Sequence, residues 1–356
     1  MEYNGSTNFF QEGAKNMAVT IKDVAKLAGV STSTVSRVCN NNPAISRETQ
    51  ERVRAAMAQL GYVPSAPADS TPQPIKMIGI VLPPSEHDAY ENTFNLKAIR
   101  GIGQVCNQRN VATTIVTGRD YDELLHSIQT LHRSGRVDGF AMLYSRKKDQ
   151  VVDYLCENGL LYVVVGKPSE LAEQTICIDN DNLLAGREAA DYLYGLGHRR
   201  IAYLGSLNDF MYAADRRAGY QLSMLLHQLP VQSDYCVEID QENSDGVDAL
   251  TVLLSREDRP TAFVVSDDIL ALTLERVCVQ KHLRIPQDVS IIAFNNSLYT
   301  QVASPQLTSV DINSYLLGQE AAVQLINHMN DPDLLATKTV VPHRIVERDS
   351  CCAITE

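Results

Sequence analysis

Apolar residues near the N-terminal end of the chain recur at the spacing of an amphipathic helix in three short segments. Each segment begins at a residue that favours a helix N-cap: Thr20, Ser31 and Ser46. Glycine, which readily adopts the left-handed conformation found at helix ends, follows the first segment at Gly29 and the third at Gly61. The pattern therefore predicts three short helices that share one small apolar core.

The second predicted helix has a polar face opposite its apolar one. The polar face carries four residues at helical spacing: Ser33, Ser36, Arg37 and Asn40. A second helix that follows the first after a short glycine turn is the helix-turn-helix arrangement, in which the second helix contacts base edges in the DNA major groove. The alternative is that this face is only the solvated side of a small helical bundle.

After residue 77, strand-like apolar runs alternate with segments of helical periodicity. A first set of expected strands, separated by helices at 96–109, 121–134 and 150–159, spans 77–82, 111–116, 139–143 and 162–165. A second set spans 177–178, 200–205, 236–239, 262–266 and 289–294. Continuous apolar strands separated by helices are typical of parallel sheets covered on both faces. We therefore expect an all-α N-terminal unit followed by two α/β lobes with doubly wound parallel sheets, between which a ligand can bind.

Net charge changes how the N-terminal helices are interpreted. The chain has 356 residues, enough for two or three domains, and a formal net charge of −12, which by itself argues against nucleic-acid binding. Residues 20–64, however, contain six lysines and arginines against three acidic residues. Because phosphate contacts are local, a small basic head on an acidic body remains able to bind DNA.

Cysteine and hydropathy patterns argue against several other classes of protein. The eight cysteines include no C-x-x-C pair and no Cys/His spacing suited to zinc, so we expect free thiols in a reducing cytoplasm. No apolar run is long enough to span a membrane, and residues 1–19, which lack the pattern of a signal peptide, are expected to be a disordered extension. No catalytic, cofactor or metal motif is recognisable, so we expect no enzymatic activity, no cofactor and no metal.

The stretch VTIKDVAKLAGVSTSTVSRVCNNNPAISRETQERVRAAMAQLGYVP matches a known family at nearly every motif position. It is similar to the DNA-binding headpiece of the lactose-repressor (LacI/GalR) family of bacterial transcription regulators. The resemblance implies that Thr32, Ser33 and Arg37 face the bases. It also implies contacts to the DNA phosphates or backbone from a second set of residues: Thr20, Ser31, Asn40, Ser46, Thr49 and Tyr62. Arginine can bind guanine O6 and N7 together and hydroxyl groups adapt to several base edges, so the implied roles suit these side chains.

A linker rich in proline, serine and alanine follows the headpiece at 65–76. Members of the family that the chain resembles usually have an asparagine here, and then a hinge helix whose leucine inserts into the minor groove. This chain has Ser65 at the asparagine position, and its leucine position falls at Thr71. Whether the linker forms a helix on DNA is therefore left open.

The resemblance extends over the rest of the chain, where the implied fold is that of periplasmic sugar-binding proteins. It implies an effector-binding and dimerisation region at 77–356, in which the chain crosses three times between two lobes. The first lobe is expected to span 77–174 and 305–330, and the second 175–304 and 331–356. These lobes follow the extension at 1–19, the headpiece at 20–64 and the linker.

Three residues at expected strand ends or loops match effector positions of the family. The resemblance implies that the guanidinium of Arg216 clamps a sugar and that Asp267 and Asn295 bind its hydroxyl groups, Asn295 replacing a more usual aspartate. Each of the three could instead form a loop cap or a hydrogen bond between lobes. Weaker candidates for the walls of the site, any of which could be ordinary packing, are Tyr90, Asn92, Phe94, Tyr144, Phe210 and Tyr299.

A finer resemblance, to the maltose-operon repressors of Gram-positive bacteria, is carried by LYSRKKDQVVDYL, ICIDNDNLLAGREAADYLYGLGHRRIAYLG, VSIIAFNNSLYTQVASPQLTSVDINSYLLGQEAA and VVPHRIVER. It implies a homodimer that binds double-stranded operator DNA and is released when maltose or a malto-oligosaccharide occupies the cleft. A regulator of the same family that responds to another disaccharide, a purine or a phosphocarrier protein would share these features. A sugar-transport protein would instead need a signal sequence and no headpiece.

Overall fold

The computed structural model describes residues 19–39, 42, 45–63, 75–84, 92–170, 172–206, 210–239 and 245–354. The chain divides into two compact units, Met1–Pro74 and Ile75–Glu356. The linker positions Ser65 and Thr71, on which a hinge helix depends, lie outside the described residues.

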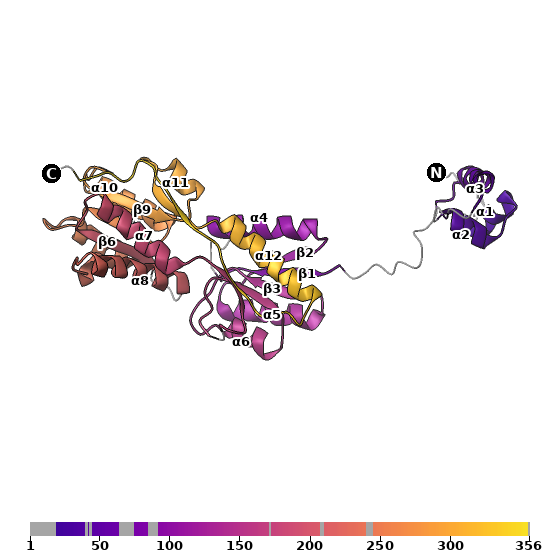
Figure 1. Ribbon diagram of the computed structural model, residues 1–356, viewed down its shortest axis with the longest axis horizontal. Helices are drawn as coiled ribbons and strands as arrows, with labels where there is room; N and C mark the ends of the chain where they lie inside the picture. The colour runs from indigo at the N-terminus through magenta and orange to yellow at the C-terminus, as the bar shows by residue number, and fades with distance from the viewer. Residues whose placement is uncertain are drawn as a thin grey trace, which may run out of the picture. The chain divides into compact units, whose positions relative to one another are not determined.

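The N-terminal unit contains the three helices that its periodicity predicts: α1 (Ile21–Ala28), α2 (Thr32–Cys39) and α3 (Arg47–Leu60) (Figure 1). Asp23 accepts hydrogen bonds from the backbone N–H and the hydroxyl of Thr20, at 2.8 and 2.6 Å, and this interaction closes the start of α1. Gly29 and Gly61 end the first and third helices with φ angles of 66° and 63°. One fully buried valine from each helix lies in the shared core: Val24, Val35 and Val53.

The first lobe of the larger unit is built on a parallel six-stranded sheet with the strand order β11-β5-β4-β3-β1-β2. Its strands are β1 (Met77–Val81), β2 (Ala112–Val116), β3 (Gly139–Met142), β4 (Tyr162–Val165), β5 (Ile176–Asp179) and β11 (Lys338–Val340). Buried apolar clusters lie on both faces of the sheet. One face packs against α4 (Thr93–Gln108) and α12 (Ser314–Asn330), and the other against α5 (Tyr121–Ser134) and α6 (Gln150–Glu157).

The second lobe has a six-stranded sheet in the order β12-β10-β9-β8-β6-β7, in which β10 and β12 are antiparallel and the other neighbours are parallel. Its strands are β6 (Ile201–Ser206), β7 (Cys236–Ile239), β8 (Ala262–Val265), β9 (Ser290–Phe294), β10 (Thr308–Asp311) and β12 (Arg344–Val346). One face packs against α7 (Asn182–Gly195) and α8 (Met211–Leu226), and the other against α9 (Asp245–Leu254) and α10 (Asp268–Gln280). Two short helices, η1 (Ser233–Tyr235) and α11 (Leu298–Val302), join these elements.

The expected α/β class with two doubly wound lobes is confirmed, but three short strands lie in the other lobe from the one expected. β5 pairs with β4 and β11, so β5 and β11 belong to the first sheet, whereas β10 pairs with β9 in the second. The expected changes of lobe at residues 174, 305 and 330 are therefore wrong. Each of these strands has three or four residues and directly precedes a crossing, and so short an apolar run does not indicate which sheet it joins.

The chain crosses between the lobes three times, after β5, β10 and β11. Asn180, in the first crossing, donates through Nδ2 to the carbonyl oxygen of Ile312 in the second, at 3.0 Å, and to that of Val341 in the third, at 2.8 Å. The side chain of Asn180 is buried, so these bonds replace those that it would form with water. A single amide group thus joins all three crossings.

A closely packed helix pair in each lobe depends on glycine. A Cβ atom added to Gly101 of α4 would lie 2.1 Å from the carbonyl oxygen of Tyr315 in α12. A Cβ atom added to Gly219 of α8 would lie 2.0 Å from the carbonyl oxygen of Leu183 in α7. Any side chain at these two positions would therefore force the paired helices apart.

We expect Gly101→Ala to lower the free energy of unfolding by about 1–3 kcal/mol, because the added methyl group overlaps the backbone of α12. Gly103→Ala on the same helix is the matched control, since a Cβ atom there meets no other atom within 4 Å. The control should be neutral or stabilising by up to ~1 kcal/mol, because alanine has the higher helix propensity. Urea unfolding followed by circular dichroism measures both variants, and equal effects would contradict the packing role of Gly101.

Candidate functional site

The residues predicted to face DNA bases lie on the accessible side of α2. This helix buries its valines and exposes four polar side chains: Thr32, Ser33, Ser36 and Arg37. Ser31 caps the helix, because its Oγ accepts a hydrogen bond from the backbone N–H of Thr34 at 3.2 Å. The spacing of the four residues places them on one face of the helix. Three hydroxyl groups and one guanidinium are thus presented together, which is chemistry suited to reading base edges.

The residues predicted to contact the DNA backbone lie at or near helix ends. Those that directly precede a helix are exposed: Thr20, Ser31 and Ser46. Thr49 is half-buried, with its hydroxyl oxygen 2.9 Å from Ser46 Oγ, and Tyr62 packs against the apolar core of the headpiece. Asn40 lies outside the described residues. Backbone N–H groups at helix starts favour anions, so these positions suit contacts with phosphate groups.

A cavity of about 940 Å³ lies between the two lobes of the larger unit. Residues at or just after the carboxyl ends of strands from both sheets line it: Leu143, Val165, Asp179, Ser206, Asp267 and Asn295. The start of α4 contributes Asn92, Phe94 and Asn95. The carboxyl ends of parallel strands are where open α/β folds bind ligands, so this cavity is the candidate effector site.

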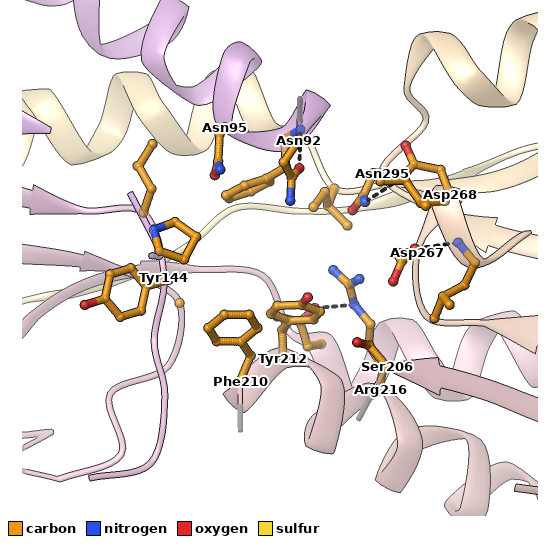
Figure 2. Close-up of a pocket in the computed structure, with 18 of the residues that line it drawn as sticks. Asn92, Asn95, Tyr144, Ser206, Phe210, Tyr212, Arg216, Asp267, Asp268 and Asn295 are labelled. Carbon is orange, nitrogen blue, oxygen red and sulfur yellow. Dashed lines mark hydrogen bonds between the residues drawn. The ribbon is translucent and has the colours of Figure 1, made fainter. Parts of the chain in front are cut away.

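Arg216 of α8 is 3% exposed and is held in place by its neighbours. Its Nε donates to Asn182 Oδ1 at 2.9 Å, and its Nη1 donates to the carbonyl oxygen of Ser266 at 2.7 Å. The guanidinium carbon lies 4.8 Å from the ring centroid of Tyr212 and 4.2 Å from that of Phe294. Figure 2 shows the guanidinium pointing into the cavity beside Tyr212.

Carboxylate and amide groups gather on the side of the cavity formed by the second lobe (Figure 2). Asp267 follows β8 and caps α10, since its Oδ1 accepts from the backbone N–H of Leu270 at 2.9 Å. Asp268 is buried and accepts hydrogen bonds from Asn295 Nδ2 and Thr93 Oγ1, both at 3.4 Å. Asn295 has a φ angle of 80°, a left-handed conformation that asparagine tolerates better than most residues. Because Thr93 belongs to the first lobe, Asp268 also joins the two lobes.

Aromatic rings from both lobes line another part of the cavity, Tyr144 from the first lobe and Phe210 and Tyr212 from the start of α8 in the second (Figure 2). The ring centroids of Tyr144 and Phe210 are 6.3 Å apart, and Phe210 stacks on Tyr212 at 5.8 Å with 20° between the ring planes. The other predicted wall residues that line the cavity are Asn92, Phe94 and Tyr299. Tyr90 lies outside the described residues. The cavity therefore offers both polar groups and aromatic rings to a ligand.

Reasoning from the sequence missed several residues that line the cavity: Asn95, Asp179, Asn180, Asn182, Ser206, Tyr212 and Asp268. For residues 179–182 a signal was available, because this polar run comes directly after an apolar strand, where α/β folds place their ligands. Tyr212 gave no such signal, since it lies inside a helical segment.

Burial raises the pKa of two carboxyl groups in the cavity. The pKa of Asp179 is raised to about 7 and that of Asp267 to about 6, because desolvation disfavours each carboxylate more than nearby Arg216 favours it. Neighbouring acidic groups add to the rise, Asp215 at the first site and Asp268 at the second. Each of the two groups therefore takes up a proton at a higher pH than an exposed aspartate does.

The cavity offers a ligand hydrogen-bond donors, acceptors and aromatic rings. Among the residues that the structure describes, no three His, Cys, Asp or Glu side chains are grouped so that they could hold a metal ion. No helix in that same part of the chain has the length and apolarity needed to cross a membrane.

Two family models match the chain. Residues 20–65 match the model described as bacterial regulatory proteins, lacI family, and residues 190–351 match the model of a periplasmic binding protein-like domain. The first match covers the helix-turn-helix surface and the second covers much of the cavity lining, including Arg216, Asp267 and Asn295.

Individual relatives cover most of the chain. The HTH-type transcriptional regulator MalR of Staphylococcus xylosus is 33% identical over 342 residues, which is 95% of this chain and 99% of that protein. The structure of a probable maltose operon transcriptional repressor from Staphylococcus aureus superposes with a TM-score of 0.71 at 25% identity, covering 77% of this chain and 97% of that one. A complex of the transcriptional regulator CelR with cellobiose also superposes with a TM-score of 0.71, at 29% identity, covering 94% of this chain and 100% of that one. The chain therefore belongs to the LacI family of bacterial DNA-binding transcriptional regulators and is not an enzyme.

Proposed function

We propose that this regulator represses genes for the use of maltose or malto-oligosaccharides, and that sugar bound in the cavity between the lobes releases it from operator DNA. The observation that carries the proposal is the cavity itself, which combines Arg216, Asp267 and Asn295 with the aromatic rings of Tyr144, Phe210 and Tyr212. Relatives support the choice of sugar: the protein from Staphylococcus aureus is named as a probable maltose operon repressor, and CelR binds the disaccharide cellobiose.

The chemistry of the cavity suits a sugar. Hydroxyl groups of a sugar donate to the carboxylates of Asp267 and Asp268 and accept from the guanidinium of Arg216. The apolar faces of the sugar rings stack on Tyr144 and Phe210, a role that falls to tyrosine and phenylalanine because the chain has no tryptophan. A disaccharide would use both sides of the cavity.

DNA recognition is assigned to α2, with Arg37 as its main base-reading residue. Two copies of the chain form a homodimer in this proposal, and each headpiece reads one half-site of a near-palindromic operator whose half-sites are about 10 bp apart or closer. The exposed polar face of α2 supports this assignment.

The sugar and the operator DNA shift the same equilibrium, which is the one between two angles of the lobes. The sugar favours one angle between the lobes, and the form with that angle binds DNA less tightly. Because the coupling is reciprocal, operator DNA lowers the affinity for sugar by the same factor. A repressor that responds to another disaccharide is the second candidate, and the cellobiose bound to CelR favours it.

The full-length chain should retard a duplex that carries an inverted repeat from a maltose-utilisation operon, and maltose should reduce that retardation. An electrophoretic mobility assay with maltose, maltotriose, cellobiose, trehalose and sucrose measures both effects. Release by another disaccharide but not by maltose would replace the proposed effector. Failure to retard any inverted repeat, with or without sugar, would overturn the proposed function.

Substitution of Arg37 should lower specificity rather than general affinity for DNA. Arg37→Ala is expected to cost about 1–3 kcal/mol of discrimination between operator and scrambled duplex, since a bidentate contact to guanine is lost. Arg37→Lys keeps the positive charge but not the planar fork, so it should lose most of the same discrimination while binding scrambled DNA as the unmodified protein does. Fluorescence anisotropy titrations at fixed salt concentration measure both affinities. An equal loss on both duplexes in Arg37→Ala would contradict base reading by this residue.

Asp267→Asn should weaken maltose binding by about 10–100-fold, because a hydrogen bond to a charged group contributes ~1.5–3 kcal/mol. Asparagine caps helices as well as aspartate, so α10 is retained. Asp181→Asn is the matched control, since the carboxylate of this exposed N-cap accepts from Leu184 N–H at 2.9 Å and does not line the cavity. Isothermal titration calorimetry gives the affinities, and equal behaviour of the two variants would exclude Asp267 from the binding site.

A further inference from the structure

We infer that the cavity selects uncharged sugars and excludes anionic ones, such as sugar phosphates and sugar acids, and that Asp268 is the main specificity-determining residue. This inference rests on the proposed sugar-binding function and adds the class of sugar that the cavity takes. It follows from the arrangement of Asp179, Asp267 and Asp268 around the buried guanidinium of Arg216.

The other cationic side chains that line the cavity are exposed to solvent. Arg119 lines the cavity, but its side chain is 78% exposed and forms a salt bridge to Glu123 at 2.8 Å. Arg276 also lines it and is exposed to solvent, which screens its charge. Lys167 forms a salt bridge to Asp215 at 3.2 Å. An anionic ligand would therefore meet more negative than positive charge in the buried part of the cavity.

The hydrogen bonds of Arg216 limit the ways in which an anion can pair with it. Phosphate and carboxylate groups bind arginine most strongly through two parallel hydrogen bonds, and the side-on form of this pair uses Nε. In this structure Nε already donates to Asn182, and Nη1 already donates to the carbonyl oxygen of Ser266. The side-on fork is therefore occupied, and the donors that remain on Nη1 and Nη2 allow an anion to pair with this guanidinium end-on at most.

Donor and acceptor types lead to the same conclusion. Ionised carboxyl groups in the cavity only accept hydrogen bonds, and a neutral sugar supplies hydroxyl donors to them. A carboxylate or phosphate dianion in place of a sugar hydroxyl supplies only acceptors, so it would leave a carboxylate that faces it unpaired and add repulsion between like charges.

Asp268 is the carboxyl group with the most capacity for a ligand. One oxygen of Asp267 is used by the cap of α10, and Asp179 Oδ1 accepts from Asn182 Nδ2 at 3.0 Å. The two oxygens of Asp268 receive only long hydrogen bonds, one from each lobe. Its carboxylate can therefore accept from ligand hydroxyls at the junction of the lobes, where an anionic group would be repelled.

The test is isothermal titration calorimetry of the full-length chain with two pairs of ligands, maltose with maltose 6′-phosphate and glucose with glucuronate. The anionic member of each pair should bind at least about tenfold more weakly than the neutral one at a pH of about 7.5. Glucuronate remains ionised from about pH 6 to 8, whereas the second pKa of a phosphate group is about 6. Discrimination against glucuronate should therefore grow as the pH rises through the raised pKa values of Asp179 and Asp267, because these groups become charged.

Asp268→Asn removes one charge while keeping the shape of the side chain. In this variant the affinity for the neutral ligand, divided by that for its anionic partner, should fall at least about fivefold. The repulsion of the anion falls, while the neutral ligand loses an acceptor. Asp181→Asn, which removes an exposed carboxylate outside the cavity, should leave both ratios unchanged. This comparison separates a local effect of Asp268 from the loss of one negative charge in the whole protein.

The outcomes distinguish this inference from the proposed function. If maltose fails to bind but another neutral disaccharide binds, the choice of effector is wrong and the same comparison is made with that sugar and its phosphate. The inference is overturned if an anionic ligand binds as tightly as its neutral partner, if only anionic ligands bind, or if no neutral sugar binds. It is also overturned if Asp268→Asn leaves both ratios unchanged, even where operator binding and release by sugar are intact.

Discussion

The side-chain amide of Asn180 is the contact on which the arrangement of the two lobes depends. Its two hydrogen bonds join the three segments in which the chain passes between the lobes. After the second crossing the chain adds β11 to the first sheet, where it pairs with β5. After the third crossing it adds β12 to the second sheet, where it pairs with β10. The lobes therefore cannot separate without loss of sheet strands, and the freedom that remains to them is rotation about the crossings. Such a rotation changes the width of the cavity while each lobe keeps its own lining residues in place.

A line of hydrogen bonds connects this junction to the cavity. Asp179, at the end of β5, accepts from Asn182 Nδ2 at 3.0 Å, and Asn182 Oδ1 accepts from Arg216 Nε at 2.9 Å. Arg216 in turn donates to the carbonyl oxygen of Ser266, which follows β8 in the second lobe. A ligand that contacts Arg216 therefore contacts a group tied to strands of both sheets. This gives a physical route by which a bound ligand can favour one lobe angle over another.

The headpiece shows how far local sequence determines structure. Its first and third helices begin at Thr20 and Ser46 and end at Gly29 and Gly61, because capping is an interaction between residues close together in the chain. The polar face of α2 follows from helical spacing for the same reason. In the larger unit, alternating strand and helix periods indicated the α/β class, and the family resemblance implied Arg216, Asp267 and Asn295 as effector residues. Asp267 and Asn295 follow strands as expected, but Arg216 lies within α8 and not at a strand end or loop. The sequence by itself therefore determined the fold class, part of the candidate site and most of the secondary structure, but not the short strands β10, β11 and β12.

Tertiary structure alone decided which sheet each short strand joins and which carboxyl groups share the cavity. β11 pairs with β5 through Lys338 and Cys177, which are far apart in the chain, and nothing in three residues of strand indicates that partner. Asp268 shows the same limit, because its hydrogen-bond partners Thr93 and Asn295 come from positions 175 and 27 residues away. The raised pKa of Asp179 depends on burial between segments that only meet in the folded chain. Spacing along a sequence carries information about neighbours within a few turns of helix or strand, whereas these contacts form only when distant segments pack together.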